Sequence, residues 1–112
     1  LRFRTVAKGS LLKVEIIQSI DRQVDLKDLA HAKGIDFSEL LDEIEAIVYS
    51  GTKLNIDYYI EEILDEESID EVYDYFMEAE TDALDAAKEE FGEDFEEELR
   101  LVRIKFISEM AN

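Results

Sequence analysis

The chain has 112 residues, which is enough for one domain, and 46% of them are hydrophobic, so a core can form. It has no cysteine, which excludes disulfide bonds, zinc fingers and thiol catalysis, and it has no proline and only four glycines, which favours helices. Its formal net charge of -18 means that a free domain of this composition is repelled by nucleic-acid phosphates.

The charge is divided unevenly along the chain. Residues 1–33 hold seven Lys or Arg against four acids, residues 34–99 hold two against 25, and residues 100–112 hold three against one. No apolar run approaches the roughly 20 residues of a membrane span, and no signal peptide is recognisable. Because the chain begins at Leu1 rather than at a methionine, we expect it to be a piece of a longer protein.

A first helix is predicted over residues 10–20. Ser10 suits the N-cap position, and the apolar residues recur four apart on one face. The β-branched residues in this stretch leave a strand as the alternative. The apolar face consists of Leu12, Ile16 and Ile20.

A second helix is predicted from Asp25 to Lys33. Asp28 lies in its first turn, where a carboxylate favours the helix dipole, and Gly34 follows its last turn as a C′ glycine. Its apolar face consists of Leu26, Leu29 and Ala30.

A third helix is predicted from about Phe37 to Ser50, capped by Asp36 or Ser38 and ended by Gly51. Together with the helix before it, it forms the outline of a helix-turn-helix, a fold most often used to bind DNA. Its apolar stripe consists of Phe37, Leu40, Leu41, Ile44, Ile47 and Val48.

Residues 54–60 fit two patterns. Their apolar residues alternate as in a strand, but Asp57 could instead cap a helix in which Ile60, Ile63 and Leu64 share a face. We favour an extended Leu54–Ile56 followed by a short helix.

Three further helices are predicted in the acidic remainder, from about Glu67 to Glu80, from a cap at Thr81 to Gly92, and after a cap at Asp94. The fold class is therefore all-α, a helix-turn-helix-containing bundle of six or seven helices. It forms a single domain, residues 1–112, with a three-helix part (10–51) and an acidic helical extension (57–112). The inward faces consist of Ile69, Val72, Tyr73, Phe76 and Met77; of Leu84, Ala87 and Phe91; and of Leu99, Val102, Phe106 and Met110.

No catalytic, cofactor-binding or metal-binding constellation is recognisable. His31 is the only histidine and is expected to lie exposed on a helix. The stretch DEESIDEVYD lacks the central glycine of a calcium loop, the serines lack a glycine elbow, and Gly9-Ser10 lacks the Walker pattern. The acids at 65–67 and 96–98 are expected to be solvated helix faces.

The aromatic and basic residues are expected to serve packing and surface roles. Stacking platforms for nucleic-acid bases normally come with a positive groove, whereas these aromatics lie among acids, so we expect them to pack in the core or on a partner. Arg100, Arg103 and Lys105 are expected near a C-terminal helix end, where positive charge favours the dipole. The aromatics concerned are Tyr58, Tyr59, Tyr73, Tyr75 and Phe76.

Several segments resemble the C-terminal helix-turn-helix region of bacterial RecQ-type DNA helicases. They are VDLKDLAHAKGIDFSELLDEIEAIVYSGTKLNIDYYI at 24–60, IIQSID at 16–21, IDYY at 56–59, YDYFMEAETDALDAA at 73–87 and RLVRIKFISE at 100–109. The resemblance implies an accessory domain of an ATP-dependent helicase that unwinds DNA in repair and recombination, in the cytoplasm and at the nucleoid.

The resemblance places the motor, the zinc-binding subdomain and the winged-helix subdomain upstream of this chain. ATP, Mg and Zn are therefore implied for the full-length helicase and no cofactor for this fragment, which has no Walker lysine loop, no DEAH-type box and no cysteine cluster. No catalytic residue of the family carries over, and the fragment is expected not to be an enzyme.

The chain departs from related helicases in the charge of its third predicted helix. Those proteins place small polar and basic residues there, whereas this chain has Glu39, Asp42, Glu43 and Glu45, which repel the DNA backbone. We therefore expect a module for protein–protein or intramolecular contact, whose partner is the rest of the helicase chain or a basic protein.

The alternative is weak DNA tethering through the basic first third of the chain, and no membrane contact is expected in either case. The candidate partner-binding residues are Glu39, Asp42, Glu43, Asp70, Glu71 and Asp74, and the candidate phosphate contacts are Lys8, Lys13, Lys27 and Lys33.

Overall fold

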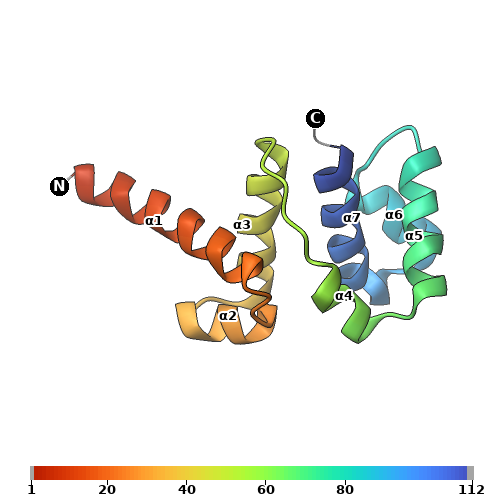
Figure 1. Cartoon of the computed structure of the whole chain (residues 1–112). Helices are drawn as coiled ribbons and strands as arrows, with labels where there is room; N and C mark the ends of the chain where they lie inside the picture. The colour runs from red at the N-terminus through yellow and green to blue at the C-terminus, as the bar shows by residue number, and fades with distance from the viewer. Residues whose placement is uncertain (1, 111–112) are drawn as a thin grey trace.

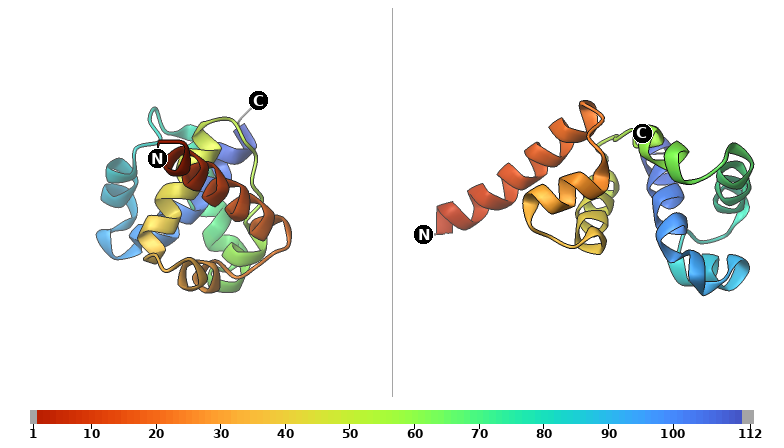
Figure 2. Two further views of the ribbon diagram at one scale, coloured as in Figure 1. Left: turned by 90° about the vertical axis from the view of Figure 1, so that its left-hand side faces the viewer. Right: turned by 90° about the horizontal axis from the view of Figure 1, so that it is seen from below.

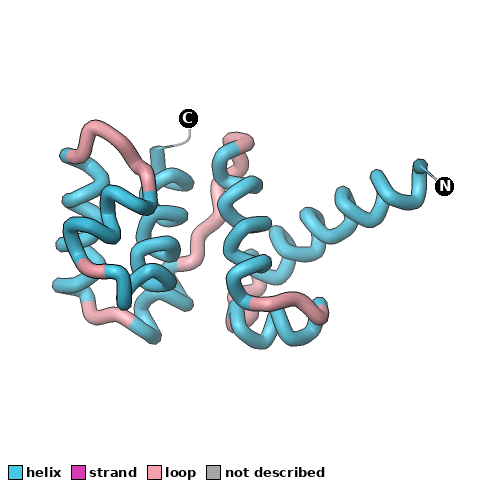
Figure 3. The backbone as a smooth tube through the Cα atoms, turned by 180° about the vertical axis from the view of Figure 1, so that it is seen from behind, coloured by secondary structure: helices cyan, strands magenta, loops and turns pink. Residues whose placement is uncertain are grey.

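The computed structural model describes the backbone of residues 2–110 and the side chains of residues 11–110. Within residues 2–110 every regular element is a helix, so the all-α prediction is confirmed and the strand alternatives at 10–20 and 54–60 are wrong (Figures 1 and 3). The elements are α1 (Arg2–Asp21), α2 (Leu26–Lys33), α3 (Phe37–Tyr49), α4 (Asp57–Ile63), α5 (Glu66–Glu78), α6 (Leu84–Phe91), the 3-10 turn η1 (Glu93–Phe95) and α7 (Glu96–Met110).

Helix α1 begins at Arg2, so its predicted start at Ser10 is wrong. The helix runs through Gly9 and Ser10, because a glycine costs only about 1 kcal/mol relative to alanine in a helix interior and no proline stops the chain here. Ser10 is therefore an internal residue and not a cap. The first half of α1 projects away from the other helices (Figures 1 and 2).

The two helices of the helix-turn-helix end where the sequence predicts. The Asp25 carboxylate caps α2, since its Oδ1 accepts the backbone N–H groups of Lys27 at 2.9 Å and Asp28 at 3.1 Å. Gly34 follows α2 with a φ of 69°, a left-handed conformation that glycine adopts without strain. The predicted apolar faces of α2 and α3 are buried, with Phe37 half-buried beside them.

Neither Asp57 nor Thr81 occupies the N-cap position of the helix that it was predicted to cap. Asp57 is the first residue of α4, and the Asn55 Oδ1 accepts its N–H at 2.9 Å. The Thr81 Oγ1 accepts the N–H of Ala83 at 3.1 Å, but α6 begins only at Leu84. The side chains of Asn55 and Thr81 thus accept backbone N–H groups where the chain enters α4 and α6. The residues 52–56 between α3 and α4 form no regular element, as favoured for Leu54–Ile56.

Helix α7 is the centre of the second half of the molecule. It packs against α3, α4, α5 and α6, and its residues Leu99 to Val102, Ile104, Ile107 and Ser108 are buried (Figure 1). The expectation that Arg100, Arg103 and Lys105 lie near a helix end is therefore wrong, because α7 runs from residue 96 to residue 110 and its middle lies between other helices.

Two methionines predicted to face inward lie on the surface. Met77 is 53% exposed near the end of α5, and Met110 is 48% exposed at the end of α7. Each occupies the last turn of its helix, where the apolar period continues beyond the point at which neighbouring helices still cover it. None of the helices in residues 2–110 combines the length and the apolar character needed to cross a membrane.

The buried Ser108 attaches the α3–α4 connection to α7. Its Oγ accepts the N–H of Leu54 and donates to the carbonyl oxygen of Leu54, each at 2.8 Å. The connection leaves α3 and crosses to the α4 side of the molecule (Figure 3). A buried backbone without regular structure needs such side-chain partners, so this serine keeps Leu54 in the core.

The cap of α2 can be tested with two substitutions of Asp25 that remove the same charge. Asn keeps the oxygen that accepts the two N–H groups, whereas Ala does not, so Asp25→Ala should be less stable than Asp25→Asn by about 1 kcal/mol. Urea denaturation followed by circular dichroism measures the difference. Equal unfolding midpoints for the two variants would show that the carboxylate does not support α2.

Candidate functional site

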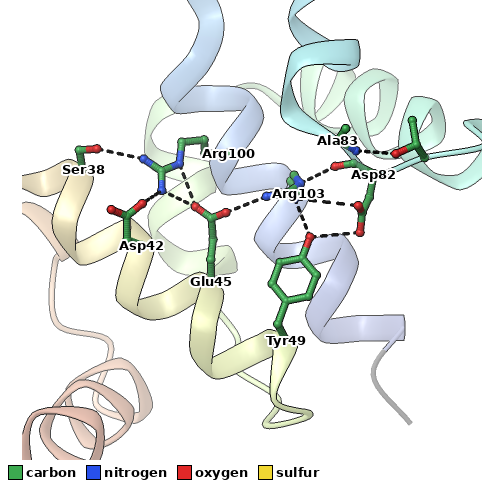
Figure 4. Close-up of polar contacts among 9 residues, drawn as sticks. Ser38, Asp42, Glu45, Tyr49, Asp82, Ala83, Arg100 and Arg103 are labelled. Atoms are coloured by element: carbon green, nitrogen blue, oxygen red, sulfur yellow. Dashed lines mark hydrogen bonds and ion pairs between the residues drawn. The ribbon is translucent and has the colours of Figure 1, made fainter. Parts of the chain in front are cut away.

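Two arginines of α7 bind the polar face of α3. The Arg100 side chain is only 8% exposed, and its Nε donates to Glu45 Oε1 at 2.9 Å. Its Nη2 bonds to Glu45 and to Asp42 Oδ1, and its Nη1 donates to Ser38 Oγ at 3.1 Å (Figure 4). Three residues of α3 thus surround one guanidinium, which makes the position of α7 on α3 specific.

Arg103 extends this contact by one helical turn. Its Nη1 donates to Glu45 Oε2 at 2.7 Å and its Nη2 to the Tyr49 hydroxyl at 2.6 Å, with the guanidinium 5.4 Å from the centre of the Tyr49 ring. Its Nε donates to the carbonyl oxygen of Asp82, in the α5–α6 connection. Glu45 therefore serves both arginines, and Arg103 joins α3 to the segment before α6 (Figure 4).

The contact raises the pKa of both Arg100 and Tyr49. Burial lowers the pKa of Arg100, but its hydrogen bonds to Glu45 and Asp42 outweigh burial, so the pKa lies above its ordinary value. Burial raises the pKa of the Tyr49 hydroxyl, and the Asp82 and Glu45 carboxylates raise it further, while Arg103 lowers it. Tyr49 is therefore a neutral hydrogen-bonding group beside an ion pair.

The α3 residues of this contact form one stripe along the helix. Ser38, Asp42, Glu45 and Tyr49 are spaced by four, three and four residues, which places them on one side of α3 next to its apolar stripe. In a DNA-reading helix-turn-helix the second helix lies with its exposed side in the major groove. Here α7 occupies part of that side (Figure 4).

The acids of α3 therefore have two roles. Glu45 is 17% exposed and Asp42 is 69% exposed, and both bind Arg100. Glu39 and Glu43 lie exposed on the remaining surface, where the Glu39 carboxylate also accepts the N–H of Asp36 at 3.4 Å. Asp42 and Glu45 thus use their charge in a contact with α7, whereas Glu39 and Glu43 keep theirs on the surface.

The six candidate partner-binding acids do not form one surface. Asp70, Glu71 and Asp74 lie exposed on α5, and Glu39, Asp42 and Glu43 lie on α3. Helix α7 packs against both helices, and α3 and α5 lie on different sides of it (Figure 1). A partner would therefore contact one of these two groups of acids.

The candidate phosphate contacts are also dispersed. Lys13 lies exposed on α1, whereas Lys33 on α2 is half-buried and binds Glu15 Oε2 at 2.7 Å. Lys27 lies 3.8 Å from Glu97 Oε1, with its Nζ 5.4 Å from the centre of the Phe37 ring. Lys8 falls outside the residues whose side chains the structure describes. Two of the four lysines thus have a carboxylate beside them.

A second polar cluster joins α4 and α5 to α7. The Lys105 Nζ donates to Asp57 Oδ1 at 3.0 Å and to Glu109 Oε2 at 2.7 Å, and the Tyr73 hydroxyl donates to Glu109 Oε1 at 2.7 Å. Burial and the bond to Glu109 raise the pKa of Tyr73 to about 12. The cluster joins the faces of three helices through hydrogen bonds.

The predicted packing role of the aromatic residues is confirmed. Tyr59 is buried, and the Tyr58 hydroxyl donates to the carbonyl oxygen of Val24 at 2.5 Å, which joins α4 to the α1–α2 turn. Tyr75 packs edge-on against Phe76 and Phe91. His31 lies exposed on α2, as expected. Among the described residues, no group of three or more His, Cys, Asp or Glu side chains could hold a metal ion.

Sequence reasoning missed the arginines and Tyr49 as members of a single contact. The available signal was periodicity. A polar stripe at 38, 42, 45 and 49 runs beside an apolar stripe, and two arginines three residues apart lie among the apolar residues of the stretch 99–104. Each pattern also fits a solvent-exposed helix face. Only the packing of α3 on α7 shows that these residues contact one another.

Removing the central arginine tests this contact. Arg100→Met leaves Glu45 without its main partner in a half-buried position, so we expect a loss of about 3 kcal/mol of unfolding free energy. The exposed Lys53→Met removes the same charge and should change stability by less than about 0.5 kcal/mol. Urea denaturation measures both, and similar losses in the two variants would contradict a specific role for Arg100.

The Glu109 carboxylate gives a pH-dependent prediction. Burial raises its pKa, but the hydrogen bonds from Lys105 and Tyr73 outweigh burial and hold it below the ordinary 4.5. Its contribution to stability is therefore fully present above pH 4.5 and is lost as the pH falls through the lowered pKa. We expect the stability difference between the wild type and Glu109→Gln to shrink as the pH falls below 4.5.

The control for this measurement is Glu90→Gln at an exposed position of α6, which changes the net charge equally. Denaturant midpoints measured across the pH range give both differences. A Glu109→Gln difference that is independent of pH would contradict the assigned hydrogen bonds.

The comparison with protein families finds a match in the first half of the chain. Residues 10–60 match the family described as RecQ-1-like, helix-turn-helix domain. This segment contains most of α1, all of α2 and α3 and the start of α4. A comparison with curated proteins found no match. The predicted resemblance to the C-terminal helix-turn-helix region of RecQ-type helicases is therefore confirmed for residues 10–60.

Proposed function

We propose that the chain is a non-catalytic C-terminal accessory domain of a RecQ-type ATP-dependent DNA helicase and that it acts through protein contact. The observation that carries this proposal is the contact of α7 with α3. Arg100 and Arg103 occupy the polar stripe of the helix that would read DNA in a helix-turn-helix protein. Ser38, Asp42 and Glu45 thus direct their hydrogen bonds to arginines of α7.

The remaining surface of α3 supports the same conclusion. Glu39 and Glu43 are exposed there, and α3 contains no Lys or Arg. Carboxylates accept hydrogen bonds mainly from cytosine and repel the phosphate backbone, which supplies most of the affinity of DNA-binding domains. The fold of a DNA-binding domain is thus retained while the charge favours a different partner.

The partner that fits the charge is basic. Between residues 57 and 98, Lys88 is the only Lys or Arg, and its Nζ binds Glu96 Oε1 at 2.7 Å. A basic surface of the helicase core, or a basic repair protein, would be attracted to this region at a rate that falls with ionic strength. In this proposal ATP, Mg and Zn act elsewhere in the full-length helicase, and repair, recombination and a cytoplasmic location follow from the parent enzyme.

One observation favours a second function, weak tethering to DNA through α1. The first half of α1 projects away from the other helices (Figure 2). Lys13 is exposed just beyond this half of the helix. Lys27 and Lys33 support this function less, because Glu97 and Glu15 lie beside them.

Both functions are tested by titrating the chain, at low and at raised salt, against a RecQ helicase core that lacks this region and against fluorescent duplex and single-stranded DNA. We expect the core to bind, and to bind more weakly as salt is added. We expect DNA to bind with a dissociation constant no tighter than about 0.1 mM. Fluorescence anisotropy measures all three.

Charge reversals separate the two functions. Lys13→Glu and Lys33→Glu should leave binding of the helicase core unchanged. Glu43→Lys, which replaces an acid of α3 by a base, is the matching variant of opposite sign. Tight, salt-sensitive DNA binding that the lysine reversals abolish, without any core binding, would overturn the leading proposal in favour of the tether.

A further inference from the structure

An apolar groove lies in the acidic half of the molecule, outside the segment that matches the RecQ-1-like family. It has a volume of about 270 Å³, close to the lower end of the range for ligand pockets, and is formed by α5, the end of α6, η1 and the start of α7. Its apolar lining is Leu64, Val72, Phe91, Phe95 and Leu99.

Phe95 forms an exposed wall of the groove. The turn at Gly92 has a φ of 106°, and Phe95 in the 3-10 turn behind it remains 51% exposed. Glu93 and Asp94 precede Phe95, and Glu96 follows it, so the ring is an isolated apolar group in a strongly acidic segment. Leu99 and Val72 at the base of the groove are buried, which provides a packed floor beneath the exposed ring.

The rim of the groove is negative. Glu71 and Glu98 line it with Ser68, and no Lys or Arg does. Among the described residues neither of these glutamates lies within an ion pair, whereas the nearby Glu96 binds Lys88. An apolar base with a carboxylate rim fits an apolar side chain flanked by cations. Burial of the apolar side chain against the base favours binding, and so does the attraction between the cations and the rim carboxylates.

We propose that this groove binds a short basic segment of a partner protein, with one Leu-like or aromatic side chain of that segment inserted between Phe91 and Phe95. This inference rests on the proposed function and names the surface that the basic partner would contact. Charge complementarity selects this occupant: nucleic acid, acidic peptides and a second copy of a chain with net charge -18 are all repelled by the rim.

The probe is a fluorescein-labelled peptide of Lys, Arg and Leu with Leu at every third or fourth position, compared with a peptide of equal charge in which Ser replaces Leu. We expect the wild-type chain to bind the Leu peptide about tenfold more tightly than the Ser peptide. Phe95→Ser should abolish this preference without loss of folding, because its ring is half exposed.

Matched variants separate the groove from general charge and apolar effects. Met77→Ser removes an exposed apolar side chain from the same half of the molecule and should leave the Leu preference intact. Glu71→Lys should weaken binding of the Leu peptide by about tenfold more than Glu43→Lys, which changes the net charge equally on α3.

The outcomes distinguish the groove from the proposed function. If the two peptides bind equally, or if Phe95→Ser behaves like Met77→Ser, the groove proposal is overturned. If core binding persists in Phe95→Ser while the peptide preference is lost, the groove takes basic segments but is not where the core binds. If the wild type binds the helicase core but neither peptide, the groove proposal fails while the proposed function stands.

Discussion

Glu45 accepts hydrogen bonds from both arginines of α7, and the arrangement of the two halves of the molecule depends on this contact. Arg100 and Arg103 reach α3 from a helix that α4, α5 and α6 also contact, so the carboxylate of one residue links the helix-turn-helix to the acidic helices. A half-buried ion pair gains little over apolar packing, but it costs much to break, and its geometry admits one position of α7 on α3. The contact therefore specifies the arrangement more than it adds stability.

The same contact accounts for the negative charge of α3. A chain with 30 acids and 12 Lys or Arg has few cations, and it places two of them in the interior against α3 and a third, Lys105, against Asp57 and Glu109. Concentrating cations between the acidic helices reduces the repulsion that the net charge would otherwise cause there. The outer surfaces of α3 and α5 keep exposed carboxylates, and in the proposed function these face a basic partner.

Most of the fold could be predicted, because local chemistry decides it. Asp25 and Gly34 bound α2 by capping and backbone conformation, and the apolar stripes of α2 and α3 are buried as their spacing indicates. The errors lie where a local signal has two readings. Ser10 suits a cap, yet α1 passes through it, and Met77 continues an apolar period that no neighbouring helix covers. The site was harder, since the residues that meet there, Glu45 and Arg100, are 55 positions apart.

The sequence by itself determined the helical class, the helix-turn-helix outline and the acidic character of its second helix, because spacing, caps and charge are properties of short segments. Tertiary structure alone decided what those acids contact. Whether a polar stripe faces water or another helix depends on which helix packs beside it. The sequence around Arg100, Arg103 and Lys105 fits an exposed face and a buried one equally, and the packing of α7 between α3 and α5 decides between them. The sequence thus sets where the charges lie along the chain. The fold sets which of them enter an internal contact and which stay exposed.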